Sequence, residues 1–153
     1  MNTIADLAWA AGIIDGEGSI FVMKQGRKDR ERTHNYIMRV SVQSTDPYMS
    51  KELCKLFPDG AVFTQEIDKR PNNSDTLKWQ IQGRKAANVL KQIVPFMRVK
   101  HEQAQLAIDF QAETKKHWRH MLNTDYELQE DYYFKLKQAK KDLKIGKASL
   151  SSI

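Results

Sequence analysis

The stretch AAGIIDGEGSI, at residues 10–20, carries the strongest structural signal in the chain. Small and apolar residues lead up to Asp15, as expected near the end of a helix, and two glycines then stop the helix. Ser19 opens the apolar run SIFVMKQ, which has the composition of a β-strand. Two carboxylates, those of Asp15 and Glu17, are therefore predicted to lie at a helix-to-strand junction where glycine permits close backbone packing.

The helix that ends at this junction is predicted to begin at Thr3, whose hydroxyl can cap it, with Asp6 near its positive end. We predict that small residues and one acid on a single face of this helix allow a second backbone to approach closely. The members of this predicted dimer interface are Ala8, Ala11, Gly12 and Asp15. The alternative is that the helix packs only against its own sheet and that Asp15 is a cap.

The acidic residues and glycines of this junction also suggest a metal site. Hard cations such as Mg²⁺ or Mn²⁺ prefer carboxylate and carbonyl oxygens. The Glu17 carboxylate and the Gly16 carbonyl are the candidate ligands. One carboxylate alone holds such an ion poorly, but two symmetry-related copies would form a cluster suited to phosphodiester hydrolysis.

The rest of the chain alternates between strand and helix patterns. Strands are predicted at 19–25, 35–43, 61–69 and 77–82, and helices begin near 3, 47, 84 and 99, with a further charged helix over 126–143. The order is α-β-β-α-β-β-α with extra C-terminal helix. This order predicts an α+β fold in which one four-stranded antiparallel sheet carries helices on one face.

The other face of this sheet is predicted to be polar and basic. Arg and Lys suit guanine edges and phosphates, and Gln suits adenine, so the face is a candidate DNA-reading surface. A solvated sheet face is the plainer interpretation. The predicted DNA contacts, which include the loop at 27–32, are Gln25, Arg27, Arg30, Arg32, Arg39, Ser41, Lys69, Lys78, Gln80 and Arg98.

Composition agrees with a nucleic-acid partner. The 153 residues suit one domain, with 25 Lys and Arg against 19 Asp and Glu, a net charge of +6. The single cysteine, Cys54, excludes an internal disulfide, which favours a reducing, intracellular setting. No apolar run is long enough for a membrane helix, and no membrane partner is expected.

Residues 10–18, AAGIIDGEG, resemble the signature of the LAGLIDADG homing endonucleases. The positions that match its letters are Ala11, Gly12, Ile14, Asp15 and Gly18. Glu17 replaces the second Asp of the signature and keeps the carboxylate. VQSTDPYMSKELCKLF and VPFMRVKHEQA also resemble segments of this family, so the likeness covers about 4–110 and leaves a basic helical extension at about 111–153.

This resemblance implies the αββαββα fold with a saddle-shaped sheet and a site-specific double-strand DNA endonuclease that uses divalent metal ions. One motif implies a homodimer acting on a long pseudo-palindromic target. By the same likeness, Glu17 and the Gly16 carbonyl bind the metal, Lys100 is the active-site lysine, and Gln43 positions solvent, with Ser44 competing for that role. Asp15 braces the helix end across the interface.

Two other functions fit the same scaffold. One is an intron-splicing maturase, with intron RNA as partner, and the other is a DNA-binding regulator that does not cleave. A generic RNA-binding sheet protein is disfavoured, because the predicted strands lack a cluster of exposed stacking aromatic residues.

Overall fold

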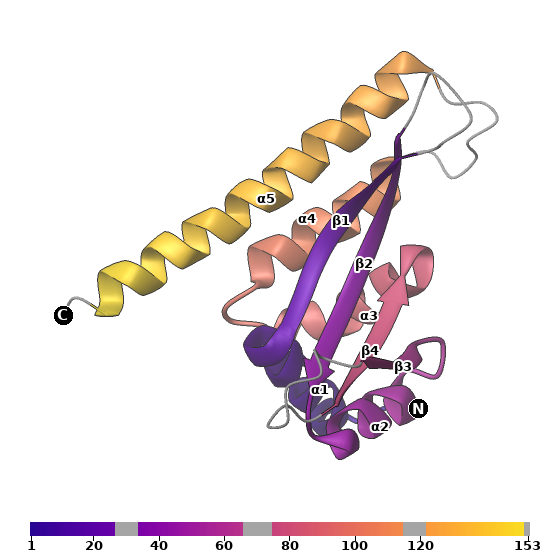
Figure 1. Ribbon diagram of the computed structural model, residues 1–153, viewed down its shortest axis with the longest axis vertical. Coiled ribbons are helices and arrows are strands. Elements are labelled where there is room, and N and C mark those ends of the chain that lie inside the picture. The colour runs from indigo at the N-terminus through magenta and orange to yellow at the C-terminus, as the bar shows by residue number, and fades with distance from the viewer. Residues whose placement is uncertain (27–33, 66–74, 115–121, 152–153) are drawn as a thin grey trace.

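The structure is a computed structural model that describes residues 1–26, 34–65, 75–114 and 122–151. Four strands form one antiparallel sheet in the order β1-β2-β4-β3. Their bounds are Gly18–Gly26 for β1, His34–Ser44 for β2, Ala61–Gln65 for β3 and Thr76–Gln82 for β4. The predicted α+β class and four-stranded antiparallel sheet are thus confirmed (Figure 1).

The helices follow in the predicted order. They are α1 (Ile4–Glu17), α2 (Pro47–Leu56), α3 (Gly83–Ile93), the 3-10 turn η1 (Val94–Phe96), α4 (His101–Glu113) and α5 (Asn123–Ser151). Thr3 and Asp6 form a reciprocal capping box at the start of α1. The helix α5 is longer than the predicted 126–143, since it begins at Asn123 and ends at Ser151.

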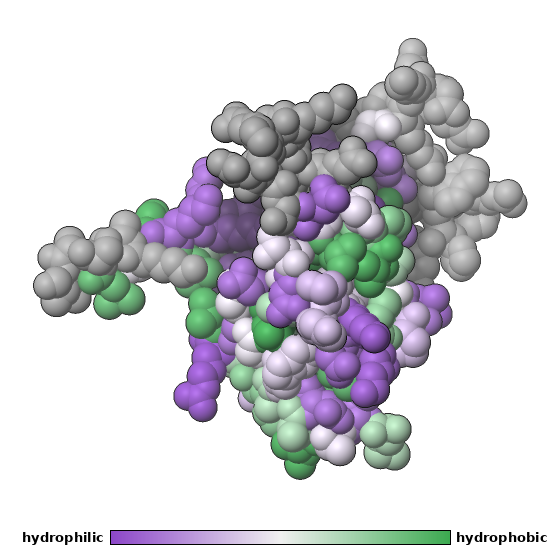
Figure 2. Space-filling model, turned by 60° about the horizontal axis from the view of Figure 1, so that its bottom comes forward, coloured by the Kyte–Doolittle hydropathy of each residue, from purple (hydrophilic) through white to green (hydrophobic). Residues whose placement is uncertain are grey.

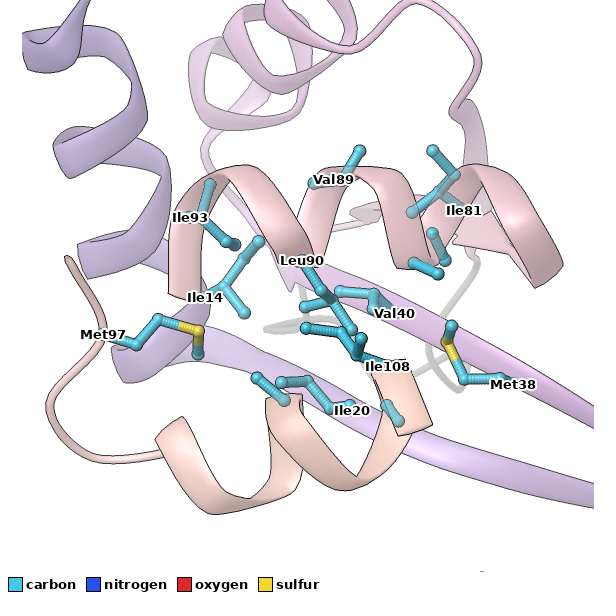
Figure 3. Close-up of a cluster of buried hydrophobic side chains, with 14 of the residues drawn as sticks. Ile14, Ile20, Met38, Val40, Ile81, Val89, Leu90, Ile93, Met97 and Ile108 are labelled. Atoms are coloured by element: carbon cyan, nitrogen blue, oxygen red, sulfur yellow. The ribbon is translucent and has the colours of Figure 1, made fainter. Parts of the chain in front are cut away.

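Alternation along the strands divides the sheet into a covered face and an open face. Met38, Val40 and Val42 of β2 are almost fully buried, beside Trp79 and Ile81 of β4. Figure 3 shows how α1, α3 and α4 add Ile14, Leu90, Ile93 and Ile108 to this core. Because every second side chain points the other way, the opposite face keeps the polar residues of the strands.

The long helix α5 lies beside the edge strand β1 and also packs on α4 (Figure 1). Its buried stripe is Tyr132, Leu136 and Ala139, and the Tyr132 ring meets the Phe110 ring edge to face at 6.0 Å. The Tyr132 hydroxyl donates a hydrogen bond to the Glu113 carboxylate. In this way α5 covers an edge that would otherwise expose unpaired backbone groups.

The described helices include none that is both long enough and apolar enough to span a bilayer.

The structure corrects one member of the predicted interface face of α1. Ala8 and Gly12 are exposed, whereas Ala11 is fully buried in the core of its own chain. With 3.6 residues per turn, the exposed row of small residues runs at a spacing of four, so Ala11 falls on the core side. Ala11 therefore cannot face a partner subunit.

Candidate functional site

Asp15 joins the end of α1 to the start of α4. Its Oδ2 accepts hydrogen bonds from the backbone N–H groups of Arg98 at 2.6 Å and Val99 at 3.2 Å. Its Oδ1 accepts the N–H of Lys100 at 2.9 Å. These donors stand just before α4, where backbone N–H groups have no partner within the helix. Asp15 thus acts within its own chain as a brace between two segments that are far apart in the sequence.

The Lys100 side chain adds a second set of hydrogen bonds between the start of α4 and the end of α1. Its Nζ donates to the carbonyl oxygen of Ile14 at 3.1 Å and to that of Gly18 at 2.6 Å. The C-terminal end of a helix carries partial negative charge, which favours a cation there. The ammonium group is therefore fixed at the end of α1, next to the residues that surround Glu17.

Gly18 permits the tight passage from α1 into β1. A Cβ atom at this position would lie 2.6 Å from the Ile14 oxygen and 2.7 Å from the Ile14 Cα. Gly16 differs, because a Cβ there would meet no described atom within 4 Å. The fold of the single chain therefore requires glycine at position 18 but gives no reason for glycine at position 16.

Glu17 and Gln43 lie at the same end of the sheet. The β1–β2 ladder starts with Gly18 opposite Val42; Glu17, the last residue of α1, directly precedes this pair, and Gln43 directly follows Val42 on β2. Glu17 is exposed, and the Gln43 amide donates to the Thr76 hydroxyl at 2.8 Å. Gln43 points to the open face.

Ser44, the competing candidate, alternates to the covered face opposite Leu77. Its hydroxyl accepts the Asp46 N–H at 3.0 Å in the turn that leads into α2. The strand register therefore places Gln43 and not Ser44 on the same side of the sheet as the other predicted contacts.

The open face brings together five of the six predicted DNA contacts that lie within the described residues. Ser41 lies between Ser19 and Gln80 across three strands. The residues that share this face by register are Gln25, Arg39, Ser41, Gln43, Lys78, Gln80 and Gln82. The Arg39 guanidinium donates to the Gln82 side-chain oxygen at 3.0 Å, which holds it along the sheet surface.

Other predicted contacts lie elsewhere. The Arg98 side chain is exposed in the segment that precedes α4 and belongs to no strand of the sheet. Four further candidates fall outside the described residues, namely Arg27, Arg30, Arg32 and Lys69.

Apolar residues on the open face were missed by the sequence analysis. Phe21 and Met23 of β1 and Phe63 of β3 share this face by register. Phe63 is about half exposed. The two phenylalanines stand on opposite edge strands, because β2 and β4 lie between β1 and β3. They therefore form no continuous stacking platform of the kind that binds single-stranded RNA.

A divalent cation fits the donor chemistry of the α1–β1 junction only in part. Glu17 offers an exposed carboxylate and Gly16 a backbone carbonyl near the helix end, which are the oxygen donors that Mg²⁺ prefers. Within 1–26, 34–65, 75–114 and 122–151, no three His, Cys, Asp or Glu side chains group as a metal site. A complete site would need ligands from a second copy of the chain or from a bound phosphate.

Lys140 of α5 reaches the same junction. Its Nζ donates to the Ser19 hydroxyl at 3.3 Å and lies 5.2 Å from the centre of the Phe21 ring. Burial, followed by the nearby charges of Lys100 and Lys144, lowers the pKa of the Lys140 ammonium below its usual value of 10.5. Its spacing from buried Leu136 on α5 was the available sequence signal for an inward position.

Comparison with known proteins gives a match in structure only. No profile of a known protein family matches the sequence, and no curated protein matches it. Among solved structures, the chain is similar to the homing endonuclease I-CvuI in complex with its target, with a TM-score of 0.70 and 18% identity. This match covers 90% of this chain and 85% of I-CvuI.

Two further structures extend the comparison. The archaeal intron-encoded homing endonuclease I-Vdi141I, complexed with DNA, has a TM-score of 0.70 and 16% identity, covering 88% of this chain and 84% of the other. The meganuclease I-SmaMI bound to uncleavable DNA has a TM-score of 0.63 and 14% identity. That match covers 90% of this chain and 46% of I-SmaMI.

These similarities define the class of architecture. The chain has the fold of the LAGLIDADG homing endonucleases. The motif helix of that resemblance is α1, and its acidic end lies where the open sheet face begins.

Proposed function

We propose that the protein is a homodimeric, site-specific double-strand DNA endonuclease that hydrolyses phosphodiester bonds with Mg²⁺ or Mn²⁺. The observation that carries this proposal is the exposed Glu17 carboxylate directly before Gly18, whose carbonyl accepts the Lys100 ammonium, at the end of the sheet where Gln43 stands on the open face. The structures of I-CvuI with its target in the presence of 2 mM Ca, and with the I-CreI target in the presence of 2 mM Mg, where the DNA is not cleaved, support an association of this fold with divalent ions.

The residues of the junction have separate roles in this proposal. Glu17 and the Gly16 carbonyl would hold the divalent ion, which would supply a water of lowered pKa and stabilise charge on phosphate oxygens. Lys100 places a fixed ammonium at the phosphate and stabilises its growing negative charge. Gln43 orients a water with its side-chain amide.

Asp15 sets the position of Lys100 through the backbone and is a positioning residue. Arg98, exposed beside it, contacts a neighbouring phosphate of the DNA.

The open face reads the DNA target. Guanidinium, ammonium and amide groups on neighbouring strands match base edges in a major groove. Residues in this role are Gln25, Arg39, Ser41, Lys78 and Gln80, with Arg27, Arg30, Arg32 and Lys69 as further predicted contacts. Each subunit covers about one turn of the duplex, which makes the whole target long and pseudo-palindromic.

Dimer formation through α1 explains glycine at position 12. A Cβ atom at Gly12 would have no described atom of its own chain within 4 Å, so the fold does not require glycine there. Glycine inside a helix nevertheless costs about 1 kcal/mol of stability relative to alanine. A partner helix in close contact supplies the reason. Ile4 and Trp9, also on α1, are exposed hydrophobic residues.

Two further observations support pairing. Figure 2, in which the end of the molecule with α1 and α2 comes forward, shows hydrophobic patches among hydrophilic ones. The chain also corresponds to 46% of I-SmaMI, whose length accommodates about two such units.

Cleavage of a randomised duplex library with Mg²⁺ tests the proposal. The wild type is compared with Glu17→Gln and with a control, Glu127→Gln, which alters an exposed acid far along the chain on α5. We expect one long site to be cut by the wild type and the control but not by Glu17→Gln. Salt-dependent binding of DNA or intron RNA without any cleavage would instead favour the regulator or the maturase.

A further inference from the structure

A groove runs between α5 and the edge strand β1, whose two faces both contribute to its lining. It has a volume of about 550 Å³ and is lined by Ser19, Phe21, Met23, Tyr133, Lys137 and Lys140, among others. One end of this groove opens at the α1–β1 junction, since Ser19 follows directly after Glu17 and Gly18. Lys140 lies at that end, with its ammonium on the Ser19 hydroxyl.

Two partly buried lysines, Lys24 and Lys140, line this groove, and only Lys24 has a counter-ion among the described residues of α5. Lys24 forms an ion pair with Glu130 at 3.0 Å, and this bond raises the pKa of Lys24. Lys140 has no such counter-ion in the described part of the chain and contacts only a neutral hydroxyl and an aromatic ring. The helix therefore supplies a carboxylate at one end of the groove and none at the end next to the proposed active site.

The position of Lys140 is unfavourable for the free protein. A partly buried ammonium without an anionic partner is costly, and the charges of Lys100 and Lys144 repel it. Like charges gathered beside a cleft are typical of a site that binds an opposite charge. An anion at the junction would relieve this repulsion and supply the missing partner.

We propose that Lys140 contacts a DNA phosphate at the α1–β1 junction and is a second cation there, besides Lys100. This inference rests on the proposed function, because the anion it assigns is a phosphodiester of the bound duplex. It makes α5 part of the DNA-binding surface. The groove end between Ser19 and Lys140 then accepts the backbone of one strand, and Lys137 and Lys144 extend the basic edge along the same helix.

Salt-dependent binding of DNA tests this assignment. Binding of a pool of randomised duplexes is measured between 50 and 200 mM salt, roughly the range over which phosphate contacts dominate. The variants are Lys140→Met, which keeps the side-chain length, Lys140→Arg, which keeps the charge, and the control Lys141→Met, an exposed lysine of the same helix.

For Lys140→Met we expect the slope of log K against log salt to become shallower by about 0.9, the value for one phosphate, with binding about tenfold weaker. Lys140→Arg should stay within about threefold of the wild type, and Lys141→Met should match it. The melting temperature of Lys140→Met should equal or exceed that of the wild type, because the variant removes an unpaired charge.

Two results would overturn the assignment. An unchanged slope for Lys140→Met, with the wild type binding DNA normally, refutes the phosphate contact and leaves the endonuclease proposal standing. A lower melting temperature together with an unchanged slope identifies Lys140 as a packing residue. If the wild type itself neither binds nor cleaves DNA, the endonuclease proposal is wrong, and this result differs from the one that refutes the Lys140 contact alone.

Discussion

Asp15 and Lys100 each hold the backbone that carries the other. The Asp15 carboxylate accepts the Lys100 N–H at 2.9 Å, and the Lys100 ammonium donates to the carbonyls of Ile14 and Gly18, on either side of Asp15. This reciprocal arrangement fixes an acidic helix end and a lysine in one place. It is the structural basis for assigning both residues to one site.

Replacing Asp15 should harm both stability and activity. Asp15→Ala leaves three backbone N–H groups without their acceptor, for a loss of about 2–3 kcal/mol in the free energy of unfolding. It also releases Lys100, so DNA cleavage should fall by at least tenfold. Urea unfolding at fixed protein concentration and a cleavage assay measure the two effects.

Asp46→Ala is the matched control for this prediction. Asp46 caps α2 by accepting the Tyr48 N–H at 2.9 Å, whereas Asp15 accepts the N–H groups that precede α4. Its loss should cost about 1 kcal/mol of stability and leave cleavage intact. Equal effects of the two variants on cleavage would contradict the positioning role of Asp15.

Gly18→Ala should destabilise the fold. The added methyl would lie 2.6 Å from a backbone oxygen that cannot move independently of α1, and we expect a loss of about 2–3 kcal/mol. Gly146→Ala on α5 has open space around it and should raise stability by up to about 1 kcal/mol. Thermal melts of both variants test the contrast, and a stable Gly18→Ala protein would show that the junction relaxes easily.

Gly12→Leu should abolish the dimer and leave the subunit folded. Nothing described within its own chain obstructs the Cβ, whereas a closely packed partner helix would. Analytical ultracentrifugation should show a shift from dimer to monomer, with unchanged helical circular dichroism. Gly146→Leu, also on an exposed helix position, should remain dimeric. A monomeric wild type would refute the pairing directly.

Stability above neutral pH should depend on Lys140. Burial and the charges of Lys100 and Lys144 lower its pKa in the folded state, so the unfolded chain binds this proton more tightly. The resulting penalty is fully present below the folded-state pKa and fades as pH rises towards 10.5. The stability advantage of Lys140→Met over the wild type should therefore shrink between pH 7.5 and 10.5.

Urea midpoints across this pH range provide the measurement. Lys141→Met should run parallel to the wild type, because Lys141 is exposed. A constant difference between Lys140→Met and the wild type at every pH would show that the Lys140 ammonium is not penalised by folding.

Local patterns were sufficient to predict the order of the elements and the buried face of β2. The capping box of Thr3 and Asp6, the Pro47 helix start and the alternation along β2 all depend on residues within a few positions of one another. The helix-to-strand junction around Gly18 was predicted for the same reason. Because these signals are short-range, the α-β-β-α-β-β-α order followed from them directly.

The contacts and orientations of the site residues depend on packing between segments that are far apart in the sequence. Asp15 meets Arg98 across 83 positions and Lys140 meets Ser19 across 121, and no periodicity links such pairs. The burial of Ala11, the choice between Gln43 and Ser44, and the inward position of Lys140 each depend on helix rotation or strand register. Those are fixed only when α1, α4 and α5 close around the sheet, because side-chain burial then selects one arrangement among several that the local pattern allows.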